Sequence, residues 1–64
     1  MTKEQRDELT AAETELRGAL AEIALMTGPR GQAEPGLIGA EIRATRERIQ
    51  HAADRLRKAE EAAV

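Results

Sequence analysis

Two stretches of the chain carry apolar residues at alternating spacings of three and four, with charged residues between them. In the first stretch these positions hold Leu9, Ala12, Leu16, Ala19, Ile23 and Met26. In the second they hold Ile38, Ile42, Thr45, Ile49, Ala52, Leu56, Ala59 and Ala63, of which Thr45 alone is polar. Residues three and four apart share one face of a helix, so the pattern is typical of amphipathic helices. It predicts helices over 2–27 and 36–62, joined by a loop over 28–35 that opens with Gly28 and Pro29.

Written as heptads, both stretches place large residues at position a and mostly small ones at position d. A line of small residues lets two helix backbones approach closely. Folding the chain back also brings Glu8 near Arg55 and Glu15 near Arg48 at the g positions, although Glu22 then meets Glu41. A parallel pairing would need a connection as long as a whole helix. The expected fold is therefore all-α, an antiparallel helical hairpin forming a single domain over 1–64.

The apolar stripe is wider than a two-helix hairpin needs. Leu20 and Ala53 at position e and Ala24 at position b extend it. A core of this size seldom supplies more than roughly 3–5 kcal/mol, and without cysteine the chain has no disulfide to add. We therefore predict that the hairpin pairs with a second copy to form a homodimeric four-helix bundle.

Composition narrows the class of protein. The net charge is −2 and 34% of residues carry charges of both signs, so no global field attracts the chain to nucleic acid. No apolar run approaches the ~18–20 residues of a membrane span, and the amino-terminal residues lack the layout of a secretory signal. We expect a cytoplasmic protein that does not enter a membrane.

Few residues offer chemistry. The chain has no serine or cysteine, and its one histidine, His51, falls on the predicted solvent face. Nucleophilic or acid–base catalysis needs such groups inside a cleft, and a zinc site needs more ligands than these. We expect no enzymatic activity, no cofactor and no bound metal. Gly18, in the middle of the first helix, has no role in the heptad pattern.

Two candidate binding surfaces follow from the pattern. Near the loop the first helix is apolar nearly all round, which indicates a docking surface for another protein. Its candidate residues are Leu20, Leu25, Met26, Arg30 and Leu37. The second candidate is a basic ridge on the second helix, formed by Arg43, Arg46 and Arg57, which would contact nucleic acid.

The opening residues Met1–Gln5 and the segment His51–Leu56 resemble the Rop family of small plasmid-encoded RNA-binding proteins. The resemblance implies an antiparallel four-helix dimer that binds paired RNA hairpin loops through polar and aromatic residues of its first helix. Lys3 matches a contact position of this kind. The chain departs from the family in having no aromatic residue and a net negative first helix.

The leading hypothesis is a homodimeric, non-enzymatic protein-binding module, such as an adaptor, an inhibitor or a small phage or bacterial regulator. Apolar anchors would supply the affinity and surrounding charges would select the partner. The alternatives are a Rop-like RNA-binding bundle and a structural subunit of a larger assembly.

Overall fold

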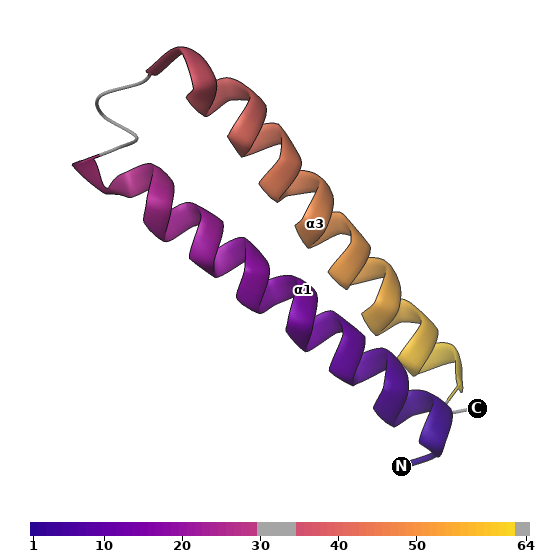
Figure 1. Cartoon of the computed structure of the whole chain (residues 1–64). Coiled ribbons are helices and arrows are strands. Elements are labelled where there is room, and N and C mark those ends of the chain that lie inside the picture. The colour runs from indigo at the N-terminus through magenta and orange to yellow at the C-terminus, as the bar shows by residue number, and fades with distance from the viewer. Residues whose placement is uncertain (30–34, 63–64) are drawn as a thin grey trace.

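The chain folds into two long helices that lie side by side and run antiparallel (Figure 1). The computed structural model describes residues 1–29 and 35–62, with the backbone alone at 35–37. Helix α1 spans Lys3–Thr27 and helix α3 spans Pro35–Ala62. The all-helical hairpin expected from the heptads is confirmed.

The first helix begins with a capping box formed by Thr2 and Gln5. The backbone N–H of Gln5 donates to Thr2 Oγ1 at 3.0 Å, and the Thr2 N–H donates to Gln5 Oε1 at 2.9 Å. This reciprocal capping box satisfies two backbone donors that no helical carbonyl can reach. At the other end, the N–H of Gly28 donates to the carbonyl of Leu25 at 3.3 Å, and the backbone leaves the helix in an extended conformation.

The d positions form the contact between the helices. We call this contact the seam, and its buried residues are Ala12, Ala19, Thr45, Ala52 and Ala59. Each is small, so the helix backbones pack closely, and among the described residues the seam has no large side chain that is fully buried. Hairpin formation therefore leaves the large apolar side chains at the a positions partly exposed to water.

Polar contacts across one edge of the seam set the register. Arg55 Nη1 lies 3.3 Å from Glu8 Oε2, and Arg48 Nη1 lies 3.8 Å from Glu15 Oε2. Both pairs were expected from the g positions. Near the open end of the hairpin, Gln5 Nε2 donates to the carbonyl of Ala59 at 3.4 Å.

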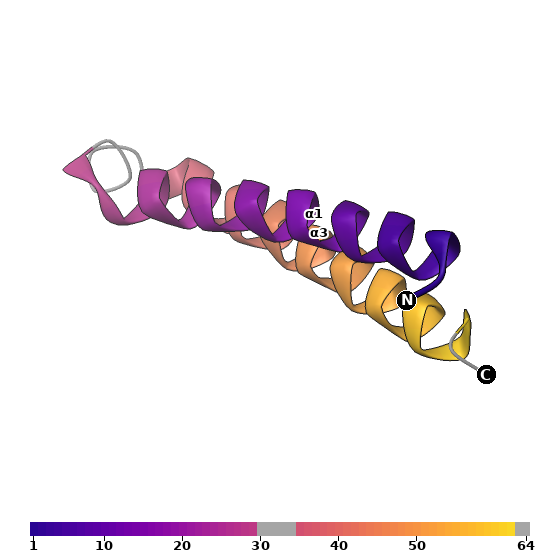
Figure 2. The same cartoon turned by 90° about the horizontal axis from the view of Figure 1, so that it is seen from below.

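The hairpin is a single layer. Its principal extents are 48 × 15 × 10 Å, which is the size of two adjacent helices with nothing stacked on either face. Turning the molecule by 90° shows the same two helices running along each other (Figure 2). Among the described residues, neither helix is long and apolar enough to cross a membrane.

Candidate functional site: an exposed apolar stripe

The large residues at the a positions lie outside the seam. The g residues border the seam on one face of the hairpin, so the a residues of both helices lie together on the other face. We call this row the apolar stripe, and its members are Leu9, Leu16, Ile23, Ile42, Ile49 and Leu56. Their exposed fractions run from 37% at Leu9 to 53% at Ile42. These six large apolar side chains thus remain partly open to solvent.

The stripe is continuous along the hairpin. The ion pairs of Glu8 with Arg55 and of Glu15 with Arg48 fix the register. In this register Leu9 is level with Leu56, Leu16 with Ile49, and Ile23 with Ile42, each pair one heptad from the next. Leu20, at position e of α1, borders this row and is 67% exposed. Soluble monomers rarely expose a continuous apolar surface of this kind unless it binds something.

The opposite face carries a polar network around Glu22. The Thr45 hydroxyl donates to Glu22 Oε2, and Arg48 Nε forms an ion pair with Glu22 Oε1 at 2.8 Å. Arg48 also reaches Glu15 across Gly18. This network satisfies the buried Thr45 hydroxyl, the one buried polar side chain recorded in the described part of the seam.

The network favours the ionised form of Glu22. The hydrogen bond from Thr45 is the main cause that lowers the pKa of the Glu22 carboxyl, and partial burial opposes it. The charge and hydrogen bond of Arg48 lower the pKa further. The carboxylate is therefore a structural acceptor, held ionised by two residues of α3.

The residues predicted to bind another protein do not all lie together. Leu20 borders the apolar stripe, whereas Leu25 is exposed about 140° further round α1, taking 100° per residue. Met26 is half-buried at the loop end of the hairpin. Arg30 lies outside the described residues, as does the side chain of Leu37.

The residues of the predicted basic ridge are exposed. Arg43, Arg46 and Arg57 all face solvent on α3. Arg57 Nη2 lies 3.7 Å from Asp54 Oδ1 one turn earlier, so part of its charge is balanced within the helix.

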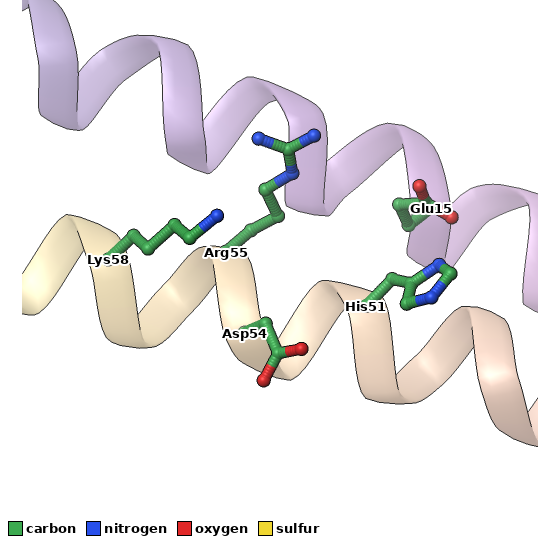
Figure 3. Close-up of a pocket in the computed structure, with 5 residues that line it drawn as sticks. All are labelled: Glu15, His51, Asp54, Arg55 and Lys58. Carbon is green, nitrogen blue, oxygen red and sulfur yellow. The ribbon is translucent and has the colours of Figure 1, made fainter.

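A depression on the polar face is lined by polar and charged side chains of both helices, namely Glu15, His51, Asp54, Arg55 and Lys58. His51 rises toward Glu15 of α1, whereas Asp54 points away from α1 (Figure 3). Within the described ranges, no group of three or more His, Cys, Asp and Glu lies close enough together to hold a metal ion. The depression therefore has mixed charge and lacks the convergent ligands of a metal site.

Comparison of the chain with family models, with curated proteins and with solved structures finds no match. The apolar stripe is therefore interpreted from its own geometry.

Proposed function

We propose that this chain is a non-enzymatic protein-binding module whose apolar stripe packs against a second copy, forming a homodimeric four-helix bundle. The observation that carries the proposal is the half-open row of Leu and Ile side chains on one face of a single-layer hairpin. A second hairpin laid on this face would convert two exposed rows into one core.

The energetics support this arrangement. Burying a Leu or Ile side chain completely contributes roughly 1.5–3 kcal/mol, and the seam alone buries none of them completely. The second copy presents an identical row with the same heptad spacing, so its ridges match the first. Dimerisation also supplies the stabilisation that a chain this small, without disulfides, needs from outside its own core.

The outer surface of the bundle remains available for another partner. Leu25 is 58% exposed on the side of α1 away from the stripe, near the half-buried Met26. Exposed Leu and Met side chains are suited to docking other proteins, with the flanking charges providing selectivity. In this proposal the cytoplasmic module acts as an adaptor, an inhibitor or a regulator by presenting this surface on a rigid bundle.

The first test is the solution mass measured by sedimentation over a range of concentrations. We expect a mass of twice the chain for the natural sequence. Leu16→Glu places a charge in the middle of the stripe, where dimerisation would have to desolvate it, so this variant should remain monomeric or unfold.

Leu25→Glu is the matched control, because it makes the same substitution on the same helix away from the stripe. It should keep the mass of a dimer. A natural chain that is folded and monomeric throughout the concentration range would overturn the dimer. The RNA-binding alternative would be favoured by two results together. The chain would bind RNA with an affinity that falls steeply as salt increases, and no protein partner would be captured through Leu25.

A further inference from the structure

The orientation of the second copy follows from the charges that flank the apolar stripe. This inference rests on the proposed dimer. Two-fold symmetry with antiparallel neighbouring helices allows two arrangements. In one, the loop ends of both hairpins lie together and α1 neighbours the partner's α3. In the other, the loop ends lie at opposite ends of the bundle, and each helix neighbours its own counterpart.

Residues at position e decide between these arrangements because they border the stripe on both sides. On α1 they are Arg6, Glu13 and Leu20, and on α3 they include Arg46, Ala53 and Glu60. All are exposed in the hairpin. No ion pair is found for Arg6 or Glu60 within residues 1–29 and 35–62. These two charges are therefore available to a second copy.

With the loop ends together, α1 meets the partner's α3 in the register that it already has with its own α3. That register aligns Leu9 with Leu56 and Leu16 with Ile49. It places Arg6 opposite the partner's Glu60, and symmetry repeats the pair on the other side of the bundle. Glu13 then lies opposite the partner's Ala53, a small neutral residue. The flanks of this arrangement bring opposite charges together and no like charges.

With the loop ends apart, the two-fold axis passes through the layer of Leu16 and Ile49, at the middle of the stripe. Arg43 then lies level with the partner's Arg57, and Arg17 with the partner's Arg17, at the outer margins of the interface. Arg6 meets only the partner's Thr27. This arrangement brings cations together and leaves Arg6 without an opposite charge.

We propose that the two copies pack with their loop ends at the same end of the bundle, selected by the pairs between Arg6 and the partner's Glu60. Exposed ion pairs are individually weak, so they choose between orientations while the apolar stripe supplies the affinity. This orientation also places both copies of Leu25 toward one end of the bundle.

Cross-linking tests the orientation without disturbing the charge pair. The chain has no cysteine, so single introduced cysteines report unambiguous contacts between copies. Ala53→Cys is mixed in turn with Glu13→Cys and with Arg46→Cys, then treated with a short bis-maleimide. Loop ends together place position 53 opposite the partner's position 13. Loop ends apart place position 53 opposite the partner's position 46.

We expect a cross-linked heterodimer from the Glu13→Cys mixture and little from the Arg46→Cys mixture. Adding Arg6→Glu to each cysteine variant should reduce the first product several-fold, and adding Glu60→Arg as well should restore it. Cross-linking mainly through position 46 in a sample with the mass of a dimer would overturn this orientation and leave the proposed dimer standing. A folded monomer would instead remove the dimer itself.

Discussion

Gly18 is the residue whose role is clearest in the three-dimensional structure. A methyl group placed on it would lie 2.7 Å from Arg48 Nη1 and 3.1 Å from its Cζ. Because Gly18 has no side chain, the Arg48 side chain has room to lie across α1 and reach Glu15 and Glu22. Glycine in a helix interior costs roughly 0.5–1 kcal/mol relative to alanine, and here it leaves room for Arg48 to form its ion pairs with Glu15 and Glu22.

Gly18→Ala should consequently fail to stabilise the protein, although alanine is the better helix former. Gly39→Ala is the matched control, because no atom lies within 4 Å of a methyl group added there. We expect Gly39→Ala to raise the free energy of unfolding by up to about 1 kcal/mol. Urea denaturation followed by circular dichroism measures both variants.

The double variant Gly18→Ala with Arg48→Ala separates the two effects. Relative to Arg48→Ala alone, it should gain as much stability as the Gly39 control gains. Equal gains for Gly18→Ala and Gly39→Ala in the natural background would contradict the role assigned to Gly18.

A residue's role could be predicted from the sequence when it is determined within a single helix. It could not be predicted when it depends on the contact between the two helices. The capping box of Thr2 and Gln5 is local, because both residues belong to the first turn of one helix and lie three positions apart. Gly18 could not be explained from the heptads, because its role depends on the path that the Arg48 side chain takes from the other helix.

At the level of the helices, the seam joins two rows of small residues and is bordered by polar contacts on one edge. Heptad positions correctly predicted the antiparallel pairing and two of the ion pairs across it. The heptad positions also predicted an unfavourable pair of like charges, Glu22 opposite Glu41. In the structure Glu22 instead turns toward Thr45 and Arg48, a change of side-chain direction that the position on the helix does not specify.

The Glu22 network should make the stability of the hairpin depend on pH. Because the pKa of Glu22 is lowered in the folded state, its contribution is fully present above the ordinary glutamate pKa. It is lost as pH falls through the lowered value, when the folded protein must take up the proton. Unfolding measured from about pH 7 to pH 3 should therefore show a loss of stability on the acid side.

Two substitutions assign that loss to Glu22. Glu22→Gln should lower the free energy of unfolding at neutral pH. It should also reduce the further loss of stability between neutral and acid pH. Thr45→Val removes the hydroxyl that is the main cause of the lowered pKa, so it should also reduce the slope. If both variants lose as much stability toward acid pH as the natural chain does, other carboxylates are responsible for the loss.

At the scale of the whole molecule, the residues that close the hairpin differ from those that remain available for assembly. The heptads place both a and d in a core. They do not say which of the two faces the neighbouring helix of the same chain, because this depends on how each helix is rotated about its axis. In the structure the d residues form the seam, and the a residues form the apolar stripe.

Thermal stability should therefore depend on protein concentration. A seam of alanines and one threonine buries little apolar area, so much of the folding free energy would come from pairing of the stripes. We expect the Tm of the natural chain to rise with concentration over a hundredfold range, measured by circular dichroism or calorimetry. A Tm that stays constant over this range would mean that the single hairpin is stable by itself.

The seam also suggests the order in which the hairpin closes. Contacts near the loop join residues close in sequence, such as Glu22 and Thr45, whereas Gln5 and Ala59 at the open end are far apart in the chain. Closing a longer loop costs more entropy, although the cost grows slowly with length. Each contact made near the loop shortens the segment that the next one must close. The contacts between the helices are therefore expected to form in order from the loop toward Thr2. The open end should be the last part of the hairpin to pair and the first to separate.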